Sequence, residues 1–255
     1  MRSLITTIAI LLTCSVAAQA DLLWDNYLPG GQSYLGEEGP GFDGLSVKSS
    51  ERNTRIDDSW TGDDAFFTDM VELQQIKWIG ALAAEAGSEF TAADVIIFEA
   101  PGQFPIDPDN LGSLIKYQAS NLPVNMDMGV WEQFDGNWRH MYEGAVDVPD
   151  VQLEAGHYFI AVRLVGNYYG QNYIATTGNG STHSEFYPDT PTDSMGVFQS
   201  YSFLYPPYEP QWVLVDEVPG TAPSDYAYQI YGNIVPEPAS IGLLALGLVA
   251  LLRRR

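Results

Sequence analysis

The side chains best suited to chemistry in this sequence are carboxylates. Two adjacent pairs stand close together, at Asp57-Asp58 and at Asp63-Asp64. Calcium prefers several carboxylate and carbonyl oxygens, which the loops between strands can supply. Asp57, Asp58, Asp63 and Asp64 are therefore our candidate calcium ligands. The alternative is an acidic loop whose charges are simply solvated.

Catalytic chemistry has little local support. Glycoside hydrolysis needs two carboxylates across a substrate, whereas neighbours on a strand point to opposite faces. The histidines His140, His157 and His183 do not have the spacing of a zinc site. The sequence has no GxSxG elbow, and a Ser-His-Asp triad assembled from distant strands stays open. We predict no catalytic residue and keep a glycoside-active enzyme as the less favoured reading.

Aromatic residues indicate a second kind of binding chemistry. Sugars stack on exposed Trp and Tyr rings while amides and carboxylates bond their hydroxyl groups. This composition is found at a Tyr-rich loop and at a hairpin, which together give our candidate carbohydrate-binding residues: Trp131, Trp138, Tyr168, Tyr169 and Tyr173. The alternative is that these rings pack the core or its edges.

The elements that must position these residues are short strands. β-Branched and aromatic residues concentrate in runs such as residues 94–99 and 158–165, with turn-forming residues between the runs. Asp135-Gly136 is a two-residue hairpin signal, and a slip in alternation at Gln74-Gln75 predicts a β-bulge. About ten strands without a long amphipathic helix predict an all-β fold, a single antiparallel β-sandwich that is jelly-roll-like.

The start of the chain has the three regions of a secretory signal peptide. Arg2 gives a positive start, residues 4–16 are mostly apolar, and Ala18-Gln19-Ala20 is a small-x-small cleavage site. Cleavage between Ala20 and Asp21 would begin the mature protein. The single cysteine, Cys14, lies in this leader, so the mature domain has no disulfide and depends on its core.

The C-terminal tail, residues 235–255, also has three parts. Pro236-Glu237-Pro238 comes first, followed by an apolar run over residues 239–252 and three arginines. The two prolines hold Glu237 extended and exposed, which is a shape that a processing enzyme can read. As a helix the apolar run would reach roughly 21 Å, less than the ~30 Å of a hydrocarbon core. The arginines favour the cytoplasmic side.

This tail resembles a PEP-CTERM sorting signal, the C-terminal segment that exosortases read in Gram-negative bacteria. The resemblance implies export, transient membrane insertion, cleavage near Pro236-Glu237-Pro238 and delivery to the cell surface or extracellular matrix. The alternative is an ordinary C-terminal membrane anchor. A looser similarity to sandwich domains of PEP-CTERM proteins, carried by motifs such as Asp63-Asp64-x-Phe66 and Ala155-Gly156-x-Tyr158, supports the fold and assigns no functional residue.

The charge of the chain limits its partners. It has 11 basic and 33 acidic residues. Four arginines lie in the two terminal signals and every acid lies between Asp21 and Glu237, so that the exported part carries 7 − 33 = −26. This balance argues against nucleic acid as a partner. It also repels anionic polysaccharide unless divalent cations bridge the two.

Three segments and one main function follow from these observations. We expect a signal peptide over residues 1–20, an exported β-sandwich over 21–234 and a sorting signal with its membrane segment over 235–255. The expected partners are the export machinery and an exosortase, and calcium is the only cofactor considered. The expected role is structural or adhesive, without catalysis. The alternative is a carbohydrate-binding module for extracellular polysaccharide.

Overall fold

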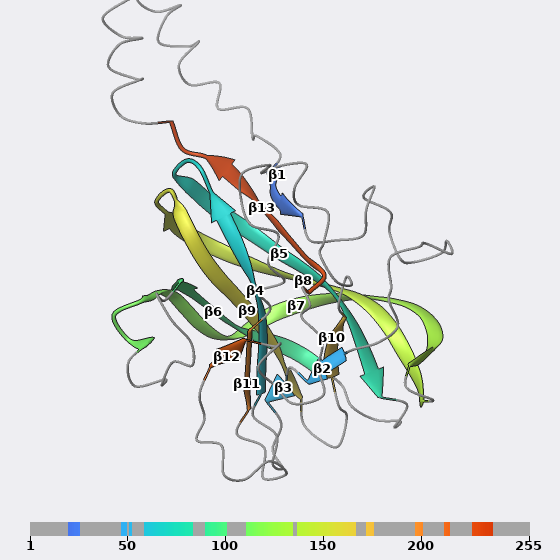
Figure 1. The fold of residues 1–255 in the computed structure, drawn as a ribbon. Helices are drawn as coiled ribbons and strands as arrows, with labels where there is room; N and C mark the ends of the chain where they lie inside the picture. The colour runs from blue at the N-terminus through green and yellow to red at the C-terminus, as the bar shows by residue number, and fades with distance from the viewer. Residues whose placement is uncertain are drawn as a thin grey trace, which may run out of the picture.

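The computed structural model describes residues 20–25, 47–49, 51–52, 59–83, 90–100, 111–134, 137–166, 172–175, 197–200, 212–214 and 226–236. These residues are almost entirely strand, and the all-β prediction is confirmed (Figure 1). The strands are β1 (Asp21–Asp25), β2 (Val47–Ser49), β3 (Glu51–Arg52), β4 (Ser59–Phe67), β5 (Val71–Ala83), β6 (Phe90–Glu99), β7 (Ile115–Phe134), β8 (Asn137–Leu153), β9 (Gly156–Gly166), β10 (Asn172–Ala175), β11 (Val197–Ser200), β12 (Val213–Leu214) and β13 (Tyr228–Ile234).

The described strands form one curled sheet, in the order β1-β13-β5-β8-β7-β6-β9-β4-β11-β12. The neighbours along this path are antiparallel, whereas the short β3 pairs in parallel with β9. β7 pairs with β6 as far as Pro123 and with β8 from Val124 onward. The sheet therefore folds over on β7 into layer A (β1, β13, β5, β8 and the second part of β7) and layer B (the first part of β7, β6, β9, β4, β11 and β12).

The main core lies between the two layers. Alternating residues of each strand point inward, as the two-residue period of a strand requires. Ile76 and Trp78 of β5 belong to the same buried cluster as Val95 of β6 and Ile160 and Val162 of β9. These side chains are essentially inaccessible to solvent. The layers are thus held together chiefly by removing apolar surface from water.

Two aromatic residues fill the space above glycines at the centre of layer A. Trp78 lies opposite Gly144, and Tyr142 lies opposite Gly80, on the paired strands β5 and β8. A Cβ atom on Gly144 would lie 2.3 Å from the Trp78 ring, and one on Gly80 would lie 2.2 Å from the Tyr142 ring. The Trp78 Nε1–H donates to the Tyr142 hydroxyl at 3.0 Å. Both glycines are therefore required by packing.

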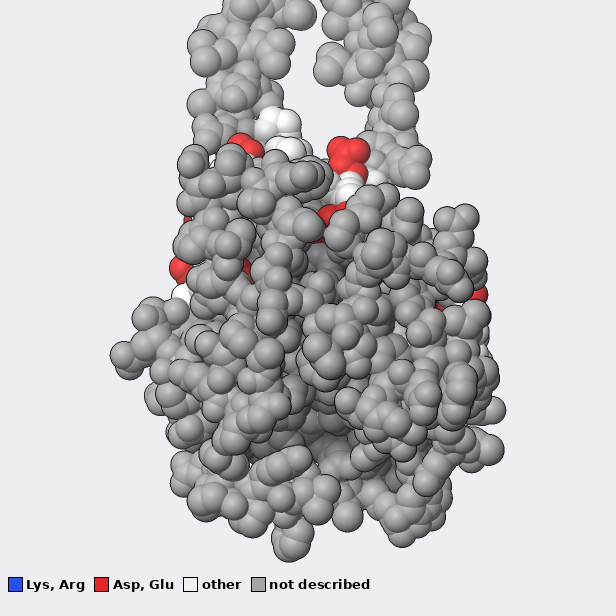
Figure 2. Space-filling model, turned by 45° about the vertical axis from the view of Figure 1, so that its right-hand side comes forward, with Lys and Arg blue, Asp and Glu red and all other residues white. Residues whose placement is uncertain are grey.

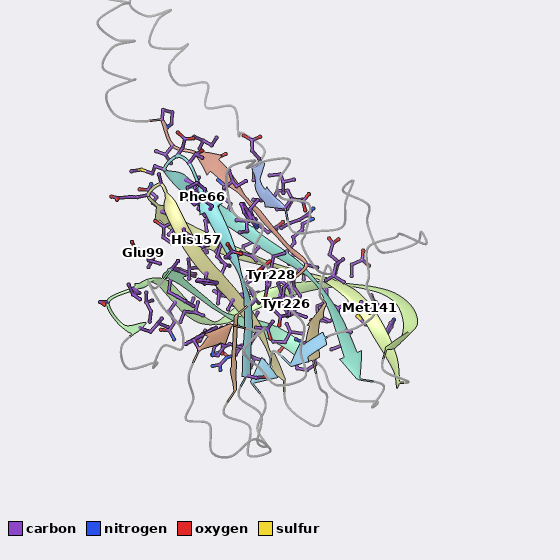
Figure 3. The ribbon with its side chains drawn as sticks, in the orientation of Figure 1. Phe66, Glu99, Met141, His157, Tyr226 and Tyr228 are labelled. Carbon is purple, nitrogen blue, oxygen red and sulfur yellow. The ribbon has the colours of Figure 1, made fainter. Side chains whose placement is uncertain are left out.

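Tyr228 connects the two layers through its hydroxyl group. This hydroxyl, from β13 of layer A, donates to the Thr61 carbonyl at 2.9 Å and accepts from the Val162 backbone N–H at 3.4 Å. Thr61 and Val162 are partners in β4 and β9 of layer B. Tyr226 and Tyr228 lie in the middle of the molecule (Figure 3). The buried centre therefore contains a polar link between the two layers among apolar side chains.

Layer B carries a second apolar cluster on its outer face. It consists of Trp60, Ile96, Phe98, Leu111, Phe159, Ala161 and Trp212. The Phe98 and Phe159 rings are stacked with their centroids 5.5 Å apart, and Trp212 lies 5.0 Å from Phe98. The part of layer B under this cluster, on β4, β6 and β9, is accordingly buried on both faces.

Several local predictions are confirmed. Residues 94–99 lie in β6 and residues 158–165 lie in β9. Phe134 and Asn137 are partners across the predicted hairpin turn. The register of β5 shifts between Leu73 and Gln75 against β8, and its register against β13 shifts at the same place, which is the predicted bulge.

Candidate processing site at the end of β13

The last strand, β13, lies between the first strand and β5. Asp21 is the partner of Gly232 on one side, and Val71 is the partner of Ile234 on the other. β1 therefore begins, and β13 ends, at the same end of layer A (Figure 1). Leu22 and Ile234 are exposed at this end, with 44% and 58% of their surface accessible. Both predicted cleavage positions thus belong to one region of the domain.

No residue separates the folded sheet from the tail motif. The Val235 backbone N–H donates to the Met70 carbonyl at 2.8 Å, and Pro236 follows directly and is exposed. Glu237 and Pro238 lie outside the described residues. At the other terminus, Ala20 immediately precedes β1, so the predicted signal cleavage site also borders a paired strand.

The surroundings of this end are acidic. Asp21 and Asp69 are exposed and Glu72 is half-buried. The Thr68 hydroxyl donates to an Asp69 carboxylate oxygen at 2.9 Å in the turn between β4 and β5. On the face seen in Figure 2, the charged side chains visible among the described residues are acidic. A protein that binds this end of layer A would therefore contact acidic side chains and the exposed Leu22.

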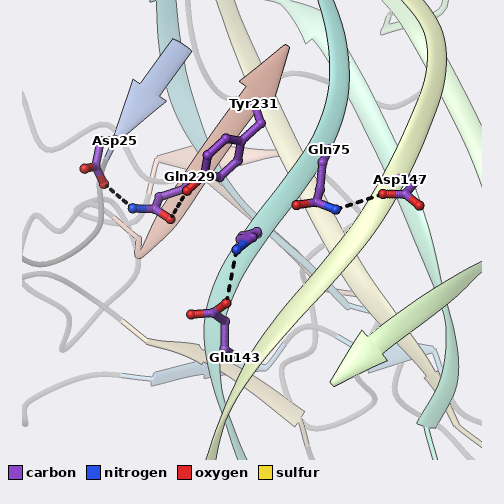
Figure 4. A network of polar contacts seen from close by, with 7 residues as sticks. Asp25, Gln75, Glu143, Asp147, Gln229 and Tyr231 are labelled. Carbon is purple, nitrogen blue, oxygen red and sulfur yellow. Dashed lines mark hydrogen bonds and ion pairs between the residues drawn. The ribbon is translucent and has the colours of Figure 1, made fainter. Parts of the chain in front are cut away.

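The outer surface of layer A carries a row of paired polar side chains, which we call the polar face (Figure 4). The Gln229 amide donates to Asp25 at 3.1 Å and accepts from the Tyr231 hydroxyl at 2.9 Å. The Lys77 ammonium lies 5.3 Å from the centre of the Tyr231 ring and 3.4 Å from Glu143. Partial burial, as the largest effect, raises the pKa of Tyr231, although Lys77 acts in the opposite direction.

One further pair completes the polar face. The Gln75 amide donates to the Asp147 carboxylate at 2.9 Å across β5 and β8. Apart from the Tyr231–Gln229 bond, which lies within β13, these polar contacts join residues on neighbouring strands. The polar face is therefore held in a fixed arrangement of amides and carboxylates.

The predicted calcium ligands are only partly described. Asp57 and Asp58 lie outside the described residues. Asp63 points into the core, where its carboxylate accepts from the Tyr226 backbone N–H at 3.1 Å. Asp64 points to the outer face and lies 2.6 Å from the His157 ring. The structure thus does not bring these two carboxylates together, and the described residues contain no group of three or more His, Cys, Asp or Glu that could hold a metal.

Three of the predicted carbohydrate-binding residues share one end of layer A, opposite the tail. Trp131 is the partner of His140 and Trp138 is the partner of Gln133 in the β7–β8 hairpin. Tyr173 is the partner of Ala81 in β5. Tyr168 and Tyr169 lie outside the described residues. The backbone therefore brings together segments that are far apart in sequence.

The Asp64–His157 pair is the described arrangement closest to a catalytic one. A carboxylate that bonds an imidazole orients a catalytic histidine in a triad. The recorded neighbours of this ring among the described residues are Asp64 and the rings of Phe66 and Phe159 (Figure 3). A nucleophile to complete a triad is not among them. Sequence reasoning missed this pair because 93 residues separate its members.

A second ion pair, with the Asp94 carboxylate fully buried, was also missed by sequence reasoning. The Asp94 carboxylate accepts from the Arg163 Nε–H at 2.9 Å and from the Asn121 backbone N–H at 2.9 Å. The Arg163 guanidinium lies 4.0 Å from the centre of the Trp60 ring. The available signal was that Asp94 and Arg163 are charged residues within the apolar strands β6 and β9. Buried charges are normally paired, so each of them needed a partner. This pair fixes β6, β7 and β9 to each other.

Comparison with known proteins identifies the tail and nothing else. A family model described as the PEP-CTERM protein-sorting motif matches residues 235–255. Neither the curated proteins nor the solved structures contain a significant match to this chain. Among residues 20–236, as far as the structure describes them, no helix is long and apolar enough to cross a membrane. The predicted membrane segment in the tail lies outside the described residues.

Proposed function

We propose that this chain, which carries a PEP-CTERM protein-sorting motif at residues 235–255, is cleaved by an exosortase and acts at the cell surface in a structural or adhesive role. The motif is the observation that carries the proposal. The exposed Pro236 supports it, because the Pro-Glu-Pro part of the motif begins immediately after the folded sheet. The predicted leader over residues 1–20 supplies the matching export step.

The structural role is supported by the construction of the domain. The described core is continuous between the two layers. The exported part, at 7 − 33 = −26, is strongly acidic, which keeps a secreted protein soluble. Such a domain suits a stable component of the cell surface, whose role depends on where it is delivered.

The mass of the surface protein tests the processing step. We expect a mature chain that begins at Asp21 and ends near Glu237. A matched variant, Glu237→Ala with Pro238→Ala, should keep its tail and remain with the membrane fraction. A surface protein that still ends in Arg253-Arg254-Arg255 would contradict the proposal.

Carbohydrate binding is the second candidate. It is supported by the meeting of the β7–β8 hairpin and β10 at one end of layer A, where Trp131, Trp138 and Tyr173 stand. The test is a polysaccharide array probed with residues 21–236, in calcium and then in chelator. Binding that Trp138→Ala abolishes and Tyr231→Ala preserves would support this function, whereas no binding in either condition would oppose it.

A further inference from the structure

We infer that the end of β13 must detach from β5 before the sorting enzyme can cleave the motif. The observation is the missing spacer between the last paired strand and Pro236. This inference rests on the proposed processing by an exosortase. It adds that residues 233–235, which belong to the folded domain, are part of the segment that the enzyme takes in.

The first step of the argument is reach. Glu237 lies two residues beyond Val235, and an extended chain spans at most roughly 7 Å over two residues. An enzyme that recognises an extended segment binds residues on both sides of the reactive position. Residues just before the motif would therefore have to enter the enzyme, and they are occupied in the sheet.

The second step is what holds these residues. The Val235 N–H is bonded to the Met70 carbonyl, and Asn233 and Ile234 are partners of Glu72 and Val71 in β5. The ladder with β1 extends only to Gly232. Residues 233–235 are thus joined to β5 on one side, while the residues before them lie between two strands.

The third step is where the detachment stops. Gly232 is buried and packed so closely that a Cβ atom on it would lie 2.1 Å from the Glu72 carbonyl oxygen. Ile230 and Tyr228 before it belong to the core. By contrast, Ile234 is 58% exposed. Strand ends with few buried contacts open at far lower free energy than the whole domain. The opening is therefore confined to residues 233–235, and the rest of the domain stays folded.

A disulfide that locks this end tests the inference. Glu72→Cys with Asn233→Cys places a pair at partner positions of β5 and β13, within the usual Cα separation of a disulfide. The mature domain has no other cysteine, because Cys14 lies in the leader. The measurement is the rate at which the full chain loses its tail in exosortase-containing membranes. We expect cleavage at least about tenfold slower when this pair is oxidised, with recovery on reduction.

Two matched controls separate the outcomes. Asn125→Cys with Ala145→Cys joins β7 to β8 at partner positions away from the tail, and should be cleaved at the wild-type rate in both redox states. A Gly-Ser-Gly-Ser insertion between Val235 and Pro236 should restore cleavage of the oxidised Glu72→Cys/Asn233→Cys chain. Equal cleavage rates for the oxidised and reduced Glu72→Cys/Asn233→Cys chain, without the insertion, would overturn this inference but not the processing proposal. An uncleaved wild-type chain would overturn the processing proposal and this inference with it.

Discussion

Tyr226 and Tyr228 are two buried tyrosines with different surroundings. The Tyr228 hydroxyl bonds both Thr61 and Val162, whereas the Tyr226 hydroxyl has no hydrogen-bond partner among the described residues. Removing a hydroxyl that satisfies buried groups leaves them unpaired, at about 1–3 kcal/mol, but removing an unsatisfied hydroxyl is nearly neutral. We expect Tyr228→Phe to lower the free energy of unfolding by that amount and Tyr226→Phe to leave it unchanged or raised. Urea unfolding measures both, and equal losses would contradict this reading.

The same tyrosines predict a loss of stability in alkali. Burial, as the largest effect, raises the pKa of both well above the ordinary value of 10.0. In the unfolded chain they lose their protons near pH 10, while in the folded chain they keep them. The free energy of unfolding contributed by these groups is therefore constant below about pH 10 and falls above it. Each Tyr→Phe variant should show a shallower fall in urea titrations at pH 9–11. An unchanged slope would show that neither group contributes.

The candidate residues could be chosen from the sequence only by type. Asp63 and Asp64 differ by one position and so face opposite sides of β4, a consequence that follows from strand geometry once the strand is known. Their partners, Tyr226 and His157, could not be predicted, because they depend on which distant strands meet. The same holds for the pairing of Asp94 with Arg163.

At the scale of elements, the pairing of β5 with β8 depends on two glycines that make room for aromatic rings. Gly144→Ala would place a methyl group 2.3 Å from the Trp78 ring, which overpacking makes unfavourable by about 1–3 kcal/mol. Gly112→Ala is the matched control, because a Cβ there meets nothing within 4 Å, and it should change stability by less than about 0.5 kcal/mol. Chemical denaturation compares them. Equal effects would mean that β8 shifts to accommodate the methyl group.

Strands with strong local signals were predictable, and the strand that shapes the molecule was not. β6 and β9 are apolar runs between turn residues, and both were identified from this pattern. For β7, the sequence indicated the hairpin at its end but not one continuous strand from Ile115 to Phe134. Asn121, with φ of 58°, and Pro123 interrupt the strand pattern where β7 changes layers. In the sequence, Asn121 and Pro123 therefore resemble the end of a strand, although β7 continues beyond them.

At the scale of the whole molecule, charge repulsion should govern the response to salt. Residues 21–237 carry 7 − 33 = −26, and salt screens repulsion between exposed charges. We expect the midpoint of thermal unfolding of residues 21–236 to rise as NaCl is increased from about 10 mM to about 500 mM, because the Debye length shortens over this range.

Calcium at matched ionic strength should raise the midpoint of thermal unfolding further if the predicted calcium site forms. Asp57→Asn with Asp58→Asn should remove only that calcium-specific part, and an identical response to both salts would contradict the calcium prediction.

The place of β13 between two antiparallel neighbours has a mechanical consequence. If the chain is cleaved as proposed and held by its new C-terminus, a pulling force would reach the domain through the end of β13, along the strand axis. The backbone hydrogen bonds to β1 and β5 lie across that axis. A pulling force therefore loads them together in shear and cannot open them one at a time. The strand that carries the tail is in this way also the one best placed to bear tension.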